Sequence, residues 1–129
     1  MILDTSFLID VLRGDQAVEE AMQTVDARGT ARISAVTVME LWEGIHLTDA
    51  TADERASVEE LLDDIPEVPF DRDCAKEAGR INATLETDGQ PIEPPDVTIA
   101  ATARVHDRPI VTANVDHFER IDDVEVLTY

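Results

Sequence analysis

The chain of 129 residues carries a formal net charge of −19, with 29 acidic residues against 10 basic ones. A length of this order suits one domain over residues 1–129, and 43% apolar residues are enough to fill one core. No apolar run approaches the roughly 20 residues of a membrane span, no basic and then apolar leader opens the chain, and the single cysteine excludes an intrachain disulfide. These features predict a cytoplasmic protein without a membrane partner.

The basic residues are themselves unusual, because Lys76 is the only lysine in the sequence. Acidic surfaces that are poor in lysine are typical of proteins from very salty cytoplasm, so we predict a halophilic protein of haloarchaeal origin. The alternative is an ordinary acidic protein with an acidic partner-binding face. At about 1 M salt the Debye length is only ~3 Å. In such a cell the charge does not exclude a nucleic-acid substrate.

Short apolar segments alternate with helical patterns along the whole chain. The first half of the chain is predicted to form a strand over 1–3, a helix over 7–12, a helix capped by Asp15 and closed by Gly29, a strand over 31–33, a helix capped by Ser34 and a helix opened by the capping box 51–54. The second half is predicted to form a strand over 68–70, a helix starting at Asp71, a loop over 87–94, a first helical turn at Pro95 followed by a helix over 97–105, a strand over 109–112 and an edge strand over 124–127. This alternation predicts an α/β fold with a parallel sheet covered on both faces.

Two apolar positions have a structural and a functional interpretation. Trp42 shares a helical face with Val38, Leu41 and Ile45, which predicts a core tryptophan; the alternative is an anchor for a partner. Cys74 lies on the apolar face of its predicted helix, which indicates a buried structural thiol rather than a reactive one.

Acidic and amide side chains recur near the boundaries of the predicted elements. Asp4 follows the first strand, Glu40 lies in the helix after the second, Asp96 precedes the helix 97–105, and Asn114 and Asp116 follow the fourth strand. Ligands of open parallel sheets bind outside the carboxyl ends of the strands. We therefore expect one oxygen-lined pocket for a hard divalent cation.

Three of these acids also have a purely structural alternative. Asp4 is placed to cap the helix that follows it. Glu40 lies three residues after Thr37, which imitates a capping box. Asp96 lies where a helix begins, and an acid there interacts favourably with the helix dipole.

Four segments carry a resemblance to a known family. They are Met1–Ser6, Ile33–Leu41, Pro95–Ala101 and Ile110–Ile121. In this order they resemble the four motifs of PIN-domain nucleases, and most of all the VapC-like toxins of toxin–antitoxin pairs. The resemblance implies a PIN-like three-layer α/β sandwich with a central parallel sheet flanked by helices. It also implies an endoribonuclease that depends on Mg²⁺ or Mn²⁺, cuts RNA, forms a homodimer and is neutralised by a VapB-like antitoxin.

The resemblance also implies site residues. Those expected to bind metal and catalyse the reaction are Asp4, Glu40, Asp96 and Asp116. We also predict that Ser6, Thr112 and Asn114 support these acids by orienting a metal-bound water or accepting a proton; the alternative for each is a structural role in capping and turns. The fourth motif departs from the family, because relatives carry an acid directly before the phenylalanine, where this chain has His117. Whether Asp116, Asn114 or His117 completes the site stays open at this point.

Phosphate contacts would fall to arginines. Arg13 follows the first short helix and Arg80 lies in the helix that starts at Asp71, so both are candidates. The alternative for each is a solvated or ion-paired side chain.

Three other functions are alternatives to a toxin nuclease. A phosphoryl acceptor of the haloacid-dehalogenase or receiver type needs a second acid just after its aspartate, or a lysine at a strand end. Here Thr5 and Ser6 follow Asp4, and Lys76 lies in a predicted helix. A catalytically inactive PIN binding module is disfavoured by the retained acids. A PIN nuclease of RNA processing would keep the chemistry without the toxin role.

Overall fold

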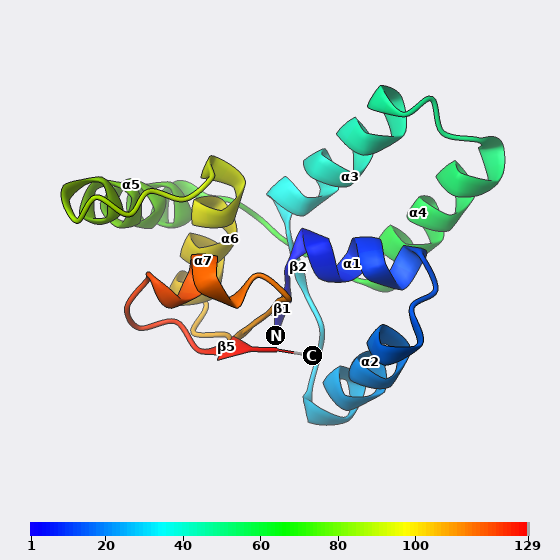
Figure 1. Ribbon diagram of the computed structural model, residues 1–129, viewed down its shortest axis with the longest axis horizontal. Helices are drawn as coiled ribbons and strands as arrows, with labels where there is room; N and C mark the ends of the chain where they lie inside the picture. The colour runs from blue at the N-terminus through cyan, green and yellow to red at the C-terminus, as the bar shows by residue number, and fades with distance from the viewer. Residues whose placement is uncertain (129) are drawn as a thin grey trace.

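The computed structural model describes residues 1–128, in which strands and helices alternate (Figure 1). The elements are β1 (Ile2–Leu3), α1 (Thr5–Leu12), α2 (Gln16–Arg28), β2 (Ile33–Ser34), α3 (Ala35–Leu47), α4 (Ala52–Asp64), β3 (Glu67–Val68), α5 (Arg72–Thr87), α6 (Pro94–Val105), β4 (Ile110–Val111), α7 (Val115–Glu119) and β5 (Val126–Leu127). Within this described part of the chain, no helix has the length and apolar character that crossing a membrane requires.

The strands form a parallel arrangement. β4 pairs with β1 on one side and with β5 on the other, and β2 pairs with β3. A bridge between Ile2 and Arg32 joins the two sets, and the amide of Leu3 donates to the carbonyl of Arg32 at 2.9 Å. The spatial order is therefore β3-β2-β1-β4-β5, which confirms the predicted central parallel sheet and the edge position of the last strand.

Alternating side chains of the strands feed two separate cores. Ile2 of β1 and Ile110 of β4 pack with α5, α6 and α7, whereas Leu3 and Val111 pack with α1 to α4. Figure 1 shows these two groups of helices on opposite sides of the strands. Successive residues of a strand point to opposite faces, so even strands of two residues supply one side chain to each face of the three-layer sandwich.

Side-chain caps begin four helices where the sequence predicts them. The capping oxygens belong to Asp15, Ser34, Thr51 and Asp71, which accept hydrogen bonds from the backbone N–H groups of Ala17, Val36, Glu54 and Cys74. Each bond satisfies a backbone donor that the first turn of a helix leaves unpaired. The predicted starts of α2, α3, α4 and α5 are confirmed.

Some predicted boundaries are wrong. The third strand ends at Val68 and does not reach residue 70, because Pro69 has no N–H to continue the ladder. Helix α6 begins at Pro94, the last residue of the predicted loop, so the start predicted at Pro95 is wrong by one residue. Helix α7 was not predicted, because its five residues are too few to show a helical period.

The two ambiguous apolar positions have different outcomes. Cys74 is fully buried and its thiol lies 3.8 Å from the Pro69 carbonyl oxygen, which confirms a structural thiol. Burial raises the pKa of this thiol. Trp42 is instead 37% exposed and packs edge-on against His46, so the prediction of a core tryptophan is wrong.

Candidate active site

Asp4 is the most buried acid of the site and lies where β1 ends and α1 begins. Its side chain is 2% exposed and accepts two hydrogen bonds at Oδ2, from Ser6 Oγ and Thr112 Oγ1, each at 2.7 Å. It makes no capping bond to the helix backbone. Thr112 directly follows β4, so the parallel pairing of β1 with β4 brings the two side chains together. The hydroxyls offset the cost of burying a charged group.

Glu40 reaches the same region from the second turn of α3. Its Oε1 lies 2.7 Å from the hydroxyl of Thr5, which in turn lies 3.0 Å from the hydroxyl of Thr37. A hydroxyl has a single proton, so when Thr5 donates it to the Glu40 carboxylate, the bond to Thr37 requires Thr37 to donate to Thr5. Helix α3 begins at Ala35, so Thr37 is not its cap and the capping-box alternative for Glu40 is wrong.

Asp96 lies in the first turn of α6 and is held by a histidine of α7. Its Oδ2 lies 2.8 Å from His117 Nδ1, and the two side chains are 16% and 41% exposed. A carboxylate only accepts, so Nδ1 carries the proton when Asp96 is ionised. The dipole position predicted from sequence is also realised, because Asp96 is the one acid in the first turn of this helix.

The three acids lie close enough for their charges to influence one another. Burial raises the pKa of Glu40, the hydrogen bond from Thr5 opposes this, and the charges of Asp4 and Asp96 raise it further. Burial likewise raises the pKa of Asp96; the hydrogen bond from His117 opposes it, and the charge of Asp4 adds to it. Three carboxylates from three different elements therefore share one region at the carboxyl edge of the sheet.

The other predicted site residues are placed differently. Asp116 is exposed and lines a small surface cavity of about 180 Å³ with Asn114 and His117. The backbone N–H of Asn114 donates to Thr112 Oγ1 at 2.9 Å, which ties this loop to the side chain that holds Asp4. The structure thus brings His117, and not Asp116, to the carboxylate of Asp96. The departure of the fourth motif from its family pattern was the sequence signal for this histidine.

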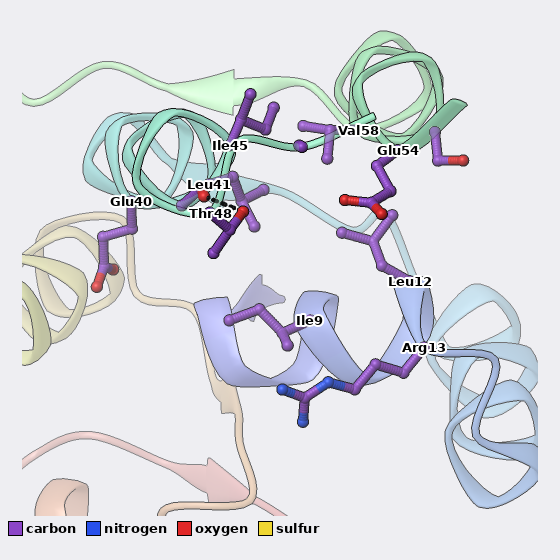
Figure 2. Close-up of a pocket in the computed structure, with 12 residues that line it drawn as sticks. Ile9, Leu12, Arg13, Glu40, Leu41, Ile45, Thr48, Glu54 and Val58 are labelled. Carbon is purple, nitrogen blue, oxygen red and sulfur yellow. Dashed lines mark hydrogen bonds between the residues drawn. The ribbon is translucent and has the colours of Figure 1, made fainter. Parts of the chain in front are cut away.

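An apolar cavity of about 400 Å³ begins beside Glu40 and continues between α1, α3 and α4 (Figure 2). Figure 2 shows Glu40 at the end nearest α6 and Arg13 at the end of α1. Arg13 forms a loose ion pair of 3.9 Å with Asp10. Arg80 instead forms a 2.7 Å ion pair with Glu77. Of the two predicted phosphate-binding arginines, Arg13 is the one that shares a cavity with a site carboxylate.

A three-layer α/β sandwich that gathers carboxylates at the carboxyl edge of a parallel sheet is the architecture implied by the four motifs above. The chain belongs to the PIN-domain family, because the sequence model of that family, described as "PIN domain", matches residues 1–124.

Named relatives and solved structures agree with this assignment. The chain is 32% identical over 120 residues to the tRNA(fMet)-specific endonuclease VapC of Shigella flexneri, covering 93% of this chain and 90% of that protein. It is 28% identical over 120 residues to ribonuclease VapC2 of Haemophilus influenzae, covering 93% and 90%. The fold matches DNA-bound VapBC from Salmonella typhimurium with a TM-score of 0.89 and 29% identity, covering 98% and 96% of the two chains. It matches VapBC2 from Rickettsia felis with a TM-score of 0.91 at 20% identity, covering 99% and 97%, a likeness of fold alone.

These relatives are bacterial proteins. The comparisons therefore do not support the haloarchaeal origin that the acidic composition predicts.

Proposed function

We propose that this protein is a metal-dependent endoribonuclease of the VapC type, built as a single PIN domain and acting as the toxin of a toxin–antitoxin pair. The observation that carries the proposal is the placement of Asp4 at the end of β1, of Glu40 on the hydroxyl of the residue that follows Asp4, and of Asp96 at the start of α6, close enough for their charges to interact. The relatives named as endonuclease or ribonuclease align with nearly the whole of this chain, and so support the same activity.

The donor chemistry of the site fits a hard divalent cation. Among residues 1–128, no group of three or more acidic, histidine or cysteine side chains is already arranged to hold a metal ion. Mg²⁺ usually binds through only one or two carboxylates and keeps several waters, so a ready-made cage is not required. Asp4, Glu40 and Asp96 are the residues that would hold Mg²⁺ or Mn²⁺. When bound, the ion would activate water and neutralise charge on the phosphate.

The side chains around the acids position them for this role. Ser6 and Thr112 fix one oxygen of Asp4, and no hydrogen bond of the described residues ends on the other, Oδ1. The hydroxyl of Thr5 holds Glu40 in the same way through one oxygen. Each carboxylate therefore keeps an oxygen for a further ligand. Arg13 is our candidate for contact with an RNA phosphate, because it shares a cavity with Glu40.

Two protein partners belong to the proposal. The neighbouring VapBC structures support a VapB-like antitoxin, and the VapC resemblance supports a homodimer. An antitoxin segment would lie on the surface of α3 near the exposed Trp42 and send an arginine or lysine toward the acids. Its cation would then pair with Asp4 and Asp96 in competition with the metal, while the segment blocks RNA.

The test of the nuclease is RNA cleavage by the purified protein with Mn²⁺ or Mg²⁺ and after removal of metal by excess EDTA. We expect cleavage with either ion and none in EDTA; cleavage that persists in EDTA contradicts the metal mechanism. The test of the toxin is expression with and without the product of the adjacent upstream gene. We expect the protein alone to inhibit growth and the pair to co-purify. A harmless protein that forms no complex would remove the toxin role and leave the nuclease untouched.

We also propose that the protein needs high salt. Of the acids in the described residues only Asp4 is buried, so almost all of the formal −19 lies near solvent. Like charges repel more strongly as the Debye length grows from ~3 Å at 1 M to ~10 Å at 0.1 M salt, and the compact state suffers most. Thermal melting in dilute buffer and in molar KCl tests this, and equal melting temperatures would refute it.

A further inference from the structure

His117 lies beside the acids at a position where its residue type departs from the PIN pattern. It occupies the third position of α7, directly before the buried Phe118, where the PIN resemblance predicts an acid. Its Nδ1 lies 2.8 Å from Asp96 Oδ2. An imidazole therefore contacts a site carboxylate at a position where the PIN resemblance implies a second carboxylate.

This contact is the only side-chain hydrogen bond that Asp96 makes within residues 1–128. The bond occupies Oδ2, and none of the described residues donates a hydrogen bond to Oδ1. Asp96 has a carboxylate neighbour in Asp4, whose charge opposes its ionised form. With no other donor, the direction of the Asp96 carboxylate depends on the imidazole alone. Loss of the ring would free the carboxylate to rotate or to turn toward solvent.

We propose that His117 is a positioning residue that holds the Asp96 carboxylate in the orientation needed to bind the divalent cation. The inference rests on the proposed metal-dependent function. His117 acts through Asp96 and uses Nδ1 for this purpose. Hydrogen-bond partners that orient a ligand typically contribute 10–100-fold to metal affinity. The short helix α7 is then the element that sets the geometry of this half of the site.

The chain allows matched variants. In His117→Asn the side-chain amide nitrogen can take the place of Nδ1, whereas in His117→Gln it lies one bond further out, near the place of Nε2. Both variants keep a neutral donor of the same chemistry. His117→Ala removes the donor altogether. The measurement is Mn²⁺ binding to the full-length protein, followed by electron paramagnetic resonance of the free ion.

We expect His117→Ala to weaken Mn²⁺ binding at least about tenfold, His117→Asn to restore most of the affinity and His117→Gln to restore little. In an Asp96→Asn background, His117→Ala should have no further effect, because its partner is already altered. If His117 only supported the fold, His117→Ala would weaken Mn²⁺ binding by the same factor with and without Asp96→Asn. Equal losses there, or rescue by Gln but not by Asn, would overturn the inference.

Circular dichroism melting of each variant separates unfolding from a binding defect, and the Asn and Gln pair keeps the test decisive if His117→Ala does not fold. Asp4→Asn distinguishes a failure of the proposed metal binding from a failure of the positioning role of His117. If the unaltered protein does not bind Mn²⁺, or if Asp4→Asn binds it equally well, the proposed metal function fails. If the unaltered protein binds Mn²⁺ and His117→Ala binds it equally well, only the positioning role fails.

Discussion

Asp4 and Asp96 share one site but are held by different parts of the molecule. Asp4 is buried at a strand end and is fixed by two hydroxyls, one of which follows the neighbouring strand. Asp96 is partly exposed at a helix start and is fixed by one imidazole from a five-residue helix. The sheet sets the first carboxylate and a surface element sets the second. The half of the site around Asp4 is therefore rigid, whereas small local changes can adjust the half around Asp96. We call the second the adjustable half.

The largest effect is expected from removing either carboxylate. Asp4→Asn and Asp96→Asn should each reduce RNA cleavage by more than the ~100-fold that loss of an outer partner causes, because each removes a proposed metal ligand. Both proteins should stay folded, since each change relieves repulsion among carboxylates. Single-turnover cleavage and thermal melting measure the two effects. Full activity in either variant would remove that residue from the site.

The hydroxyls around Asp4 allow a matched comparison of stability. Thr112 is fully buried and serves both Asp4 and the backbone N–H of Asn114. Thr112→Val keeps the shape but removes the hydroxyl, so it should lower the free energy of unfolding by about 2 kcal/mol. Ser6→Ala should cost less than ~1 kcal/mol, because Ser6 is partly exposed and water can replace its hydroxyl. Urea unfolding measures both. Equal losses of unfolding free energy in Thr112→Val and Ser6→Ala would contradict the view that burial beside the sheet fixes the half of the site around Asp4.

Much of the fold could be predicted because its signals are local. The caps at Asp15, Ser34 and Asp71 fix helix starts within a few residues of sequence, and the strands were found as short apolar runs between helices. The predictions that failed concern positions where the local sequence pattern was overridden by a neighbouring residue or by packing. Pro69 ended a strand that its apolar neighbours favoured. Trp42 lay on the predicted apolar face, yet the core on that side is filled by other side chains and leaves it at the surface.

The site was predictable only in part. Placement at strand ends was enough to propose Asp4, but the hydroxyl of Thr5 on Glu40 depends on how α1 and α3 pack, which no sequence spacing reveals. The pairing of Asp96 with His117 joins residues 21 apart through the position of α7. Helix α7 is too short for its residues to show a helical periodicity in the sequence. The choice between His117 and Asp116 could therefore not be made from the sequence.

Glu40 should make the stability of the metal-free protein depend on pH. Burial has the largest effect and raises the pKa of Glu40 above its value in the unfolded chain, and the neighbouring acids raise this pKa further. A raised pKa means that the folded state binds the proton more tightly, so the ionised group costs stability above the folded-state pKa and costs nothing below the unfolded value. Glu40→Gln should therefore be more stable than the parent at pH 7, with a difference that closes as the pH falls below about 4. Melting across this range, in EDTA, measures it. A difference that widens at low pH would have the wrong sign.

Asp116 should give the smallest effect and so tests which residue of α7 belongs to the adjustable half. Its side chain is exposed and makes no hydrogen bond or ion pair among the described residues, whereas His117 contacts Asp96 directly. The free energy of unfolding should therefore change by no more than about 0.5 kcal/mol on Asp116→Asn. Because this side chain contacts none of the three acids, cleavage should change by no more than about twofold, which is ~0.4 kcal/mol in activation free energy. Asp122→Asn, another exposed acid after α7, is the matched control for the loss of one negative charge. If Asp116→Asn is as inactive as Asp96→Asn while Asp122→Asn is active, then Asp116 belongs to the site. The helix would then have to turn on binding metal or RNA, because only such a movement brings that carboxylate to the other acids.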